Sequence, residues 1–255
     1  PMNEDELKAK TLGETFESGV YRDIWTLIRT NMDVIKSAKP NVSKNSAGYY
    51  LWNIWDENKK TFDLCKLIVG SQGTLGIVTK VKWKLVPVEK YSNVLAIFMP
   101  DIKNLGKIVT EILPFKPDSL ESYDDYSMKL AVRFFFDFIT YLGPIETMKL
   151  GLRFLPEALM MLTGGIPKLT IIVEVSGASE KEVHEKLSAI QKTVTHFRYK
   201  TRIARSSAEA EKYWRIRRES FNLLRKHVHN KRTAPFIDDV IVPPDCLPEF
   251  LPKLQ

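Results

Sequence analysis

The chain has 255 residues, of which 44% are hydrophobic and 27% charged, a balance that excludes a disordered or fibrous protein. Its 38 Lys and Arg against 31 Asp and Glu give a net charge of +7, which suits a small anionic ligand, an anionic membrane surface or nucleic acid. The sequence holds no run of about 18 apolar residues, so we expect no membrane-spanning helix, and Pro1–Lys10 lacks the apolar core of a signal peptide.

The two cysteines, Cys65 and Cys246, are far apart in the sequence and make neither a zinc motif nor a disulfide framework. We expect both to be free thiols in a reducing compartment, which favours the cytoplasm. The chain starts at Pro1 without an initiating Met and stops at Gln255 within an apolar stretch, so we expect it to be part of a longer protein.

In the first part of the chain, apolar residues at helical spacing predict a helix over about 20–38. A loop rich in Asn, Ser and Gly follows over 41–50, then an aromatic cluster at 49–55 that predicts core or an interface, and a short helix over about 61–67. After three glycines, the alternation of Val81, Trp83 and Leu85 with lysines predicts a strand that ends at Pro87.

In the second part, strands and helices alternate. The predicted strands cover 94–99, 119–123, 169–175, 199–205 and 236–242, and the predicted helices cover 102–113, 126–138, a segment opened by the capping box at Ser179–Glu182, and a segment from a second capping box at Ser206–Glu209 to about His229. This order predicts an α+β architecture of antiparallel sheet and helices. We expect two domains, 1–88 and 89–255.

The most apolar stretch is 130–162, in which Phe134–Phe136 and many leucines stand among a few charged residues such as Arg133 and Lys149. One interpretation is paired amphipathic helices that pack on the sheet. The other is a surface that docks on a membrane or a partner protein, because apolar residues beside basic ones suit the cytoplasmic leaflet.

The stretch from Leu67 to Thr79 contains three closely spaced glycines between two apolar runs. Glycine permits positive φ and close backbone approach, so such a loop presents N–H groups with little side-chain bulk, as a flat or phosphorylated cofactor requires. The alternative is a turn between two buried segments, because G-x-x-G-x-x-G alone is no phosphate-binding fingerprint.

The residues around these glycines resemble sequence motifs of a known family. Gly70–Thr79 is similar to the G-S-E-G-T-L-G-I-I-T signature of FAD-linked oxidases of the vanillyl-alcohol oxidase superfamily, and Ser43–Tyr49, Tyr213–Arg218 and Thr233–Pro243 resemble its K-N-x-x-G-Y element, its W-x-x-R helix and a strand of its cap domain. The resemblance implies the C-terminal part of a PCMH-type FAD-binding domain followed by a substrate (cap) domain. It implies FAD contacts from Lys44, Asn45, Gly48, Gly70, Ser71, Gly73, Thr74, Gly76 and Ile77.

Arg217 falls near the middle of the apolar arc of its predicted helix, so we expect its guanidinium to be buried and to need an anion. One partner is structural, Asp238 or Asp239, of which at least one is expected to be buried. The other is a substrate carboxylate held bidentately. In the family the arginine of W-x-x-R binds the carboxylate of a 2-hydroxy acid, and the resemblance implies that role for Arg217.

The histidines His184, His196, His227 and His229 have no metal-binding spacing, so we predict no metal site. The catalytic base and metal ligands of related dehydrogenases lie in an H-x-G-x-G-N-x-H motif, which we expect beyond Gln255; a pyrophosphate loop is also absent, and Gln72 replaces the acid of the signature. We therefore do not expect this chain to oxidise a substrate alone.

The resemblance implies FAD-dependent oxidation of a small 2-hydroxy acid such as D-lactate or glycolate, with hydride transfer to flavin N5. The expected electron acceptor is a quinone, a cytochrome or an Fe–S protein, and nucleic acid is not an expected partner of the enzyme. The expected location is the cytoplasm, with peripheral contact to the inner face of the membrane through 130–162 as an open alternative. The rival function is a non-catalytic basic, aromatic-rich module that docks on protein, membrane or nucleic acid.

Overall fold

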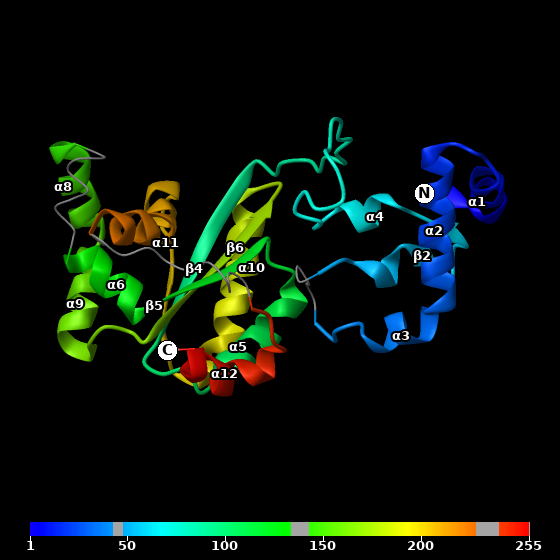
Figure 1. Cartoon of the computed structure of the whole chain (residues 1–255). Helices are drawn as coiled ribbons and strands as arrows, with labels where there is room; N and C mark the ends of the chain where they lie inside the picture. Colours follow the sequence, from blue (N-terminus) through cyan, green and yellow to red (C-terminus); the bar gives the residue numbers. More distant parts are fainter. Residues whose placement is uncertain (43–47, 134–142, 228–239, 255) are drawn as a thin grey trace. The chain divides into compact units, whose positions relative to one another are not determined.

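A computed structural model describes residues 1–42, 48–133, 143–227 and 240–254 (Figure 1). The chain divides into two compact units: one comprises Pro1–Leu85 with Ile237–Pro243, and the other Val86–Phe236 with Pro244–Gln255. Each unit has its own buried apolar core.

The first unit is mainly helical. Its described elements are β1 (Met2–Asn3), α1 (Glu4–Thr11), α2 (Phe16–Thr30), α3 (Met32–Ser37), the 3-10 helix η1 (Leu51–Asn53), β2 (Trp55–Asp56), β3 (Thr61–Phe62) and α4 (Cys65–Ile68). The strands form a small antiparallel sheet in the order β1-β3-β2. Trp25 contacts Trp55 and Phe62 at ring-centroid distances of 4.9 and 5.9 Å, so the predicted aromatic cluster packs on the core through Trp52 and Trp55, whereas Tyr49 is exposed.

The single helix predicted over 20–38 is wrong in its bounds. The structure has α2 and α3, separated at Asn31, whose side-chain amide donates to the Leu27 carbonyl at 2.9 Å and so competes with the helical pattern. Helix α2 also begins earlier, where the hydroxyl of Thr15 accepts from the N–H of Ser18. Helix α1, with its capping box of Asn3 and Glu6, was not predicted, because only Leu7 of that helix is buried.

The strand predicted after the glycines is also wrong. Residues 77–89 are assigned no regular secondary structure, and apolar side chains along this segment are exposed, including Ile77, Trp83 and Leu85. Alternation of apolar and polar residues alone does not make a strand, because the backbone N–H and C=O groups of a strand need a neighbouring strand to bond to. No strand pairs with this segment within the described parts of the chain. The predicted short helix over 61–67 is likewise divided into β3 and α4.

The second unit contains a four-stranded antiparallel sheet in the order β5-β6-β4-β7 (Figure 1). Its described elements are β4 (Tyr91–Met99), α5 (Leu105–Ile112), η2 (Leu113–Phe115), β5 (Ser119–Asp124), α6 (Asp125–Arg133), α8 (Pro144–Arg153), α9 (Leu155–Gly164), β6 (Leu169–Gly177), α10 (Glu180–Val194), η4 (Thr195–Phe197), β7 (Lys200–Ile203), α11 (Ser207–His227), η5 (Pro244–Cys246) and α12 (Leu247–Leu254). The antiparallel α+β architecture is confirmed. The predicted strand 236–242 is not seen at 240–242, and its remainder lies outside the described residues.

The topology is two interleaved split β-α-β units. Strands β4 and β5, joined through α5, are parallel with β6 between them, and β6 and β7, joined through α10, are parallel with β4 between them. Because β4 and β6 are central, both their faces are buried, and six consecutive residues from Val94 to Met99 are inaccessible or nearly so.

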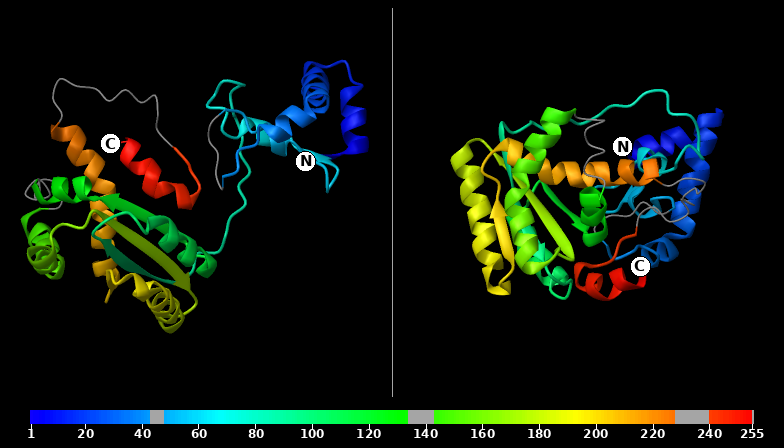
Figure 2. Two further views of the ribbon diagram at one scale, coloured as in Figure 1. Left: turned by 90° about the horizontal axis from the view of Figure 1, so that it is seen from below. Right: turned by 90° about the vertical axis from the view of Figure 1, so that its left-hand side faces the viewer.

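The two faces of the sheet carry different helical layers (Figure 2). On one face, α5 and α10 pack on residues such as Leu95, Ile97 and Val173. On the other face, α6 and α11 pack on residues such as Ala96, Phe98 and Ile172. Helix α12 adds Leu247 and Leu251 to the first layer.

Helices α6, α8 and α9 form a long connection between β5 and β6. Helix α9 has an inverted distribution of side chains: Glu157 is 2% exposed, whereas Leu155, Leu159 and Leu162 are 54%, 57% and 83% exposed. Helix α8 also exposes a stripe at helical spacing, formed by Ile145, Met148 and Leu152. We call these six residues the α8–α9 apolar surface.

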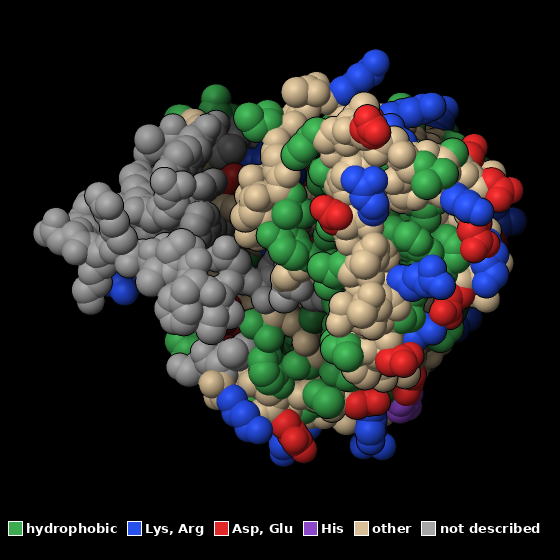
Figure 3. All heavy atoms as spheres, turned by 45° about the vertical axis from the view of Figure 1, so that its right-hand side comes forward, with side chains coloured by type: hydrophobic (Ala, Val, Ile, Leu, Met, Phe, Trp, Pro, Cys, Tyr) green, Lys and Arg blue, Asp and Glu red, His purple; other side chains and the backbone are tan. Residues whose placement is uncertain are grey.

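Within the described residues, no helix is both long and apolar enough to cross a membrane. Both cysteines are free thiols, as predicted, and both are exposed. On the face drawn in Figure 3, acidic and basic side chains are interspersed, so the net charge of +7 makes no wide basic area there.

Candidate functional site

The glycine-rich loop follows α4 in the first unit. Gly73 and Gly76 have φ values of +77° and +155°, in the region that favours glycine, and Gln72 between the first two glycines has φ +52°. A Cβ placed on either glycine would meet no atom within 4 Å. The backbone of the loop is therefore open on the side where a side chain would project, as contact with a flat ligand requires.

Hydrogen bonds fix the start of this loop. The N–H of Ser71 donates to Ile68 at 3.1 Å, and the N–H and hydroxyl of Thr74 both donate to the Ser71 carbonyl, at 3.0 and 2.6 Å. The side chain of Ser71 is buried, whereas Thr74 is exposed. These bonds leave the glycines uncovered while holding the chain around them in one conformation.

Tyr49 joins two of the sequence motifs. Its hydroxyl lies 2.9 Å from the Thr74 hydroxyl, so the end of the K-N-x-x-G-Y element contacts the glycine-rich loop although 25 residues separate them. Gly48, next to Tyr49, has φ +68° and open space at its Cβ position. Lys44 and Asn45, the other predicted residues of this element, lie outside the described residues.

In the second unit, α11 is held by a buried group of charges. Lys212, fully buried, places its Nζ 2.7 Å from Glu157 Oε2 on α9, 2.8 Å from the Arg153 carbonyl and 3.4 Å from Glu209 Oε1. Tyr213, also fully buried, donates to Glu157 at 2.6 Å. The aromatic rings of Phe154 and Tyr213 lie about 5 Å from the same ammonium.

Arg202 on β7 completes this group, which we call the Lys212 network. Its Nε donates to Glu209 at 2.6 Å and lies 3.5 Å from Glu157. Two carboxylates and two cations are thus brought together with matched charge. Burying such a group costs free energy of desolvation. Removing one of its charged side chains costs still more, because the opposite charge would stay buried without its partner.

The network alters the titration of its members. Burial alone would raise the pKa of Glu209, but the N–H of Arg205, the guanidinium of Arg202 and the ammonium of Lys212 together hold this pKa below its usual value. The charge of Glu209 therefore adds stability above its unfolded-state pKa of about 4.3, and this stability is lost as the pH falls through the lowered pKa. Burial, then the nearby Glu157 carboxylate, raise the pKa of Tyr213, so its hydroxyl stays a donor.

The buried cation of α11 is thus Lys212 and not Arg217, whose predicted burial is wrong. Arg217 has a side chain 47% exposed. The apolar arc predicted for this helix included residues from 221 to 228, and these moved the centre of the arc toward Arg217. In the described part of the helix, the buried apolar side chains are those of Tyr213 and Ile216. One signal for Lys212 was available, since it stands three residues after Glu209 beside an aromatic residue.

Arg217 pairs with Glu121 on β5. Its Nε and its Nη2 lie 3.1 and 3.0 Å from the same oxygen, Oε2, of Glu121. Asp238 and Asp239, the structural partners expected from the sequence, lie outside the described residues. The guanidinium of arginine is planar and matches the geometry of carboxylates and other planar anions, such as Glu121 here.

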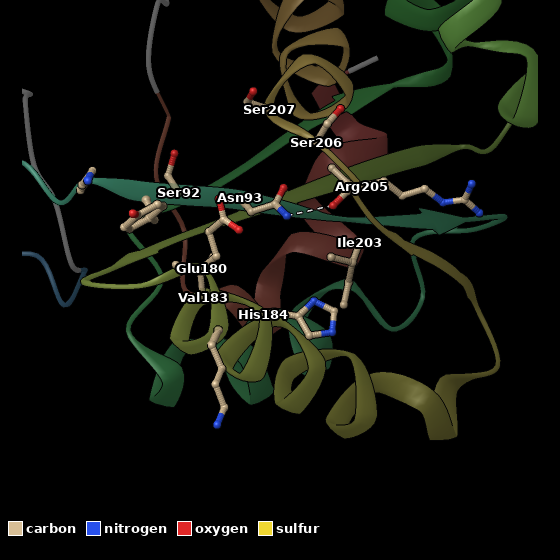
Figure 4. A pocket seen from close by; sticks show the side chains of 13 residues that line it. Ser92, Asn93, Glu180, Val183, His184, Ile203, Arg205, Ser206 and Ser207 are labelled. Atoms are coloured by element: carbon tan, nitrogen blue, oxygen red, sulfur yellow. Dashed lines mark hydrogen bonds between the residues drawn. The ribbon is translucent and has the colours of Figure 1, made fainter.

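A pocket of the second unit lies apart from Arg217 and Lys212. It has about 890 Å³ and lies where β7 ends short of the first residues of β4, beside the starts of α10 and α11 (Figure 4). Asn93 spans it with a hydrogen bond of 2.8 Å to the Ala204 carbonyl, and the Arg205 side chain points away from its centre (Figure 4). It contains none of the predicted site residues.

No group of three or more His, Cys, Asp or Glu that could hold a metal ion occurs among the residues the structure describes. His196 contacts the Thr193 carbonyl at 2.8 Å and Glu111 of α5 at 3.4 Å.

Comparison with known proteins identifies the family. The family described as FAD linked oxidases, C-terminal domain, matches residues 88–255. A protein named D-2-hydroxyglutarate dehydrogenase from Pseudomonas putida is 25% identical over 239 residues, which cover 91% of this chain and 22% of that protein.

Two further relatives carry other names. Glycolate oxidase subunit GlcD of Bacillus subtilis is 30% identical over 139 residues, 49% of this chain and 27% of its own length. D-lactate dehydrogenase [cytochrome], mitochondrial, of Arabidopsis thaliana is 30% identical over 82 residues, 32% of this chain and 12% of its own length. The chain thus spans about a quarter or less of these curated relatives, and it belongs to the FAD-linked oxidase family, of which residues 88–255 match the C-terminal domain.

Proposed function

We propose that the protein to which this chain belongs is an FAD-dependent dehydrogenase or oxidase of a small 2-hydroxy acid. The observation that carries the proposal is Arg217, whose side chain is 47% exposed at the position of the family's W-x-x-R arginine, within the segment that matches the family. When bound, the flavin would accept the hydride from the α-carbon of the hydroxy acid. Arg217 would hold the substrate carboxylate and so fix the orientation of that carbon.

We assign FAD binding and substrate binding to different parts of the chain. Residues 1–88 would form the C-terminal part of a PCMH-type FAD-binding domain, and residues 89–255 the substrate domain. The open backbone of the glycine-rich loop and its bond to Tyr49 support this assignment. The proposed flavin contacts are Lys44, Asn45, Gly48, Gly70, Ser71, Gly73, Thr74, Gly76 and Ile77.

The substrate class follows from an arginine that binds one carboxylate. The names of the relatives point to D-2-hydroxyglutarate, glycolate and D-lactate as the acids to test, all of which carry a hydroxyl beside a carboxylate. The electron acceptor would be a quinone, a cytochrome or an Fe–S protein.

We also propose a cytoplasmic location with peripheral contact to the membrane through 130–162. The α8–α9 apolar surface supports this contact, because a helix that faces its polar residue inward and its leucines outward needs something apolar to cover them. The surface would let the enzyme deliver electrons to an acceptor in the bilayer.

Gly73→Val should abolish flavin binding by the whole protein. Valine is strained at φ +77° and would fill the open space beside the loop. We expect at least a tenfold lower ratio of flavin absorbance near 450 nm to protein absorbance. Gly165→Val is the matched control, since Gly165 has φ +75° and equally open space but lies in the second unit. Equal flavin loss in both variants would contradict the loop assignment. A whole protein that takes up no flavin would favour the non-catalytic docking module.

Arg217→Met should raise the KM for the hydroxy acid by roughly 10- to 150-fold, because a charged hydrogen bond to a carboxylate contributes about 1.5–3 kcal/mol. Flavin content should stay unchanged. Arg218→Met is the control, since Arg218 is exposed on the same helix and pairs with Glu211 instead. Steady-state kinetics of the whole protein, with an artificial electron acceptor, give the comparison. The substrate role of Arg217 is wrong if its variant keeps the wild-type KM.

Replacing Leu155, Leu159 and Leu162 together by Ser should weaken sedimentation of the whole protein with phosphatidylserine-containing vesicles by at least tenfold, because three partly buried leucines contribute several kcal/mol. Leu12 and Phe16 are 76% and 90% exposed in the first unit, and their replacement by Ser should leave sedimentation unchanged. Wild-type protein that stays in the supernatant at low salt would rule out the membrane contact.

A further inference from the structure

We propose that Arg198 and Lys200 form a headgroup site at the end of the α8–α9 apolar surface, where they bind the phosphate of an anionic phospholipid. The inference rests on the membrane contact proposed above and names the lipid chemistry that the protein recognises. Neither cation was singled out from the sequence, and both lie outside residues 130–162.

The site is a pocket of about 250 Å³ at the C-terminal end of α9, where β4 ends and where β6 and β7 begin. Its apolar lining includes Phe98, Met160, Ile166 and Pro167. Arg198 and Lys200 also line it, and both are exposed. The pocket thus offers apolar contact and positive charge together, which is what an anionic lipid needs.

The register of the strands directs Lys200 toward α9. Lys200 is paired with Phe98 on β4, and residues directly opposite each other on antiparallel strands share a face. Phe98 faces the layer of α6 and α11, against which Met160 of α9 also packs. A Cβ placed on Gly164 would lie 3.5 Å from Lys200 Nζ, so the ammonium group reaches the last turn of α9.

The positive charges of the pocket are not balanced within the described parts of the chain. Among the residues that the structure describes, neither Arg198 nor Lys200 has an ion pair or a side-chain hydrogen bond. Arg202, farther along the same strand, is paired with Glu157 and Glu209. Two cations that line one pocket repel each other, and a phosphate group between them would replace this repulsion by attraction.

The apolar side chains next to the pocket favour a lipid over a soluble phosphate compound. Ile166, which lines the pocket, is 38% exposed, and Leu162, two residues before Gly164, is 83% exposed. Leu159 and Leu155 continue the apolar surface along α9, which is about 15 Å long. A soluble phosphate compound would leave these leucines in water, whereas a bilayer covers them and supplies phosphate groups at its surface.

The test is the sedimentation of the whole protein with vesicles of phosphatidylcholine, with and without an equal part of phosphatidylserine. Arg198→Gln together with Lys200→Gln should lower the partition coefficient on phosphatidylserine-containing vesicles by about 10- to 30-fold, because each basic residue near an anionic surface contributes about fivefold. Binding to pure phosphatidylcholine vesicles should change by less than about twofold, because the apolar surface is intact. The charge-preserving pair Arg198→Lys and Lys200→Arg should stay within about threefold of wild type.

Lys107→Gln together with Lys116→Gln is the matched control, because it removes the same charge from the second unit. Lys107 is exposed on α5, which packs on the opposite face of the sheet from α9. Lys116 is also exposed, and its φ of +50° is close to the φ of +60° at Arg198. Neither lysine lines the pocket, so this variant should bind phosphatidylserine-containing vesicles within about twofold of wild type.

Equal weakening in the control variant would overturn the proposal, because general charge attraction would then explain the binding. Micromolar binding of soluble glycerophosphoserine in calorimetry would also overturn it, since the pocket would then serve a soluble phosphate compound. Wild-type sedimentation of the Arg198→Gln, Lys200→Gln variant, with the leucine variant impaired, would overturn the headgroup site alone. Wild-type protein that stays in the supernatant with both kinds of vesicle would overturn the membrane contact first, so the two failures are distinguishable.

Discussion

The second unit depends on an ammonium group that has no access to water. Lys212 is surrounded by Glu157, Glu209 and a backbone carbonyl, and Arg202 balances the second carboxylate. These four side chains come from α9, α11 and β7, so the network ties the inserted helices, the helix with the W-x-x-R motif and the edge of the sheet to one another. Losing one member would leave a buried charge uncompensated, which makes the arrangement specific as well as stable.

This network has a consequence for function. It fixes the rotation and axial position of α11 at its N-terminal half, where Tyr213 and Ile216 also pack on the sheet. Arg217 follows within two turns and extends beyond the apolar core to Glu121. The arginine is therefore presented from a rigid element and not from a loop, which suits the proposed role of Arg217 in orienting a substrate. The glycine-rich loop of the first unit differs, because it presents backbone groups, and its glycines leave the space beside them open.

The sequence predicted the regular parts of the second unit well. Periodicity located β4, β6, α5 and α10, because central strands and amphipathic helices carry strong apolar patterns. Two of the motifs, the K-N-x-x-G-Y element and the glycine-rich loop, are in contact through Tyr49 and Thr74. The strand predicted after the glycines failed because strand formation needs a partner that alternation cannot reveal.

Burial of charged residues was harder to predict. Arg217 was expected in the core and Lys212 was overlooked, since a helical wheel averages a whole helix whereas burial depends on what packs on each turn. The carboxylate nearest to Lys212, that of Glu157, lies 55 residues away on α9, and no local pattern links the two residues. Glu121 was missed for the same reason, being 96 residues from Arg217. Long-range ion pairs follow from topology, which the pattern of one sequence specifies only in outline.

The role of the Lys212 network in holding α11 is tested most directly by the coupling between Lys212 and Glu157 in the free energy of unfolding. A double-mutant cycle with Lys212→Met and Glu157→Gln in urea should show that each single change costs about 3–5 kcal/mol. The double variant should cost less than the sum by about 1–3 kcal/mol, because the second change removes a charge already left without its partner. Single changes that cost under about 1 kcal/mol each and simply add would contradict the claim that this network holds α11 in place.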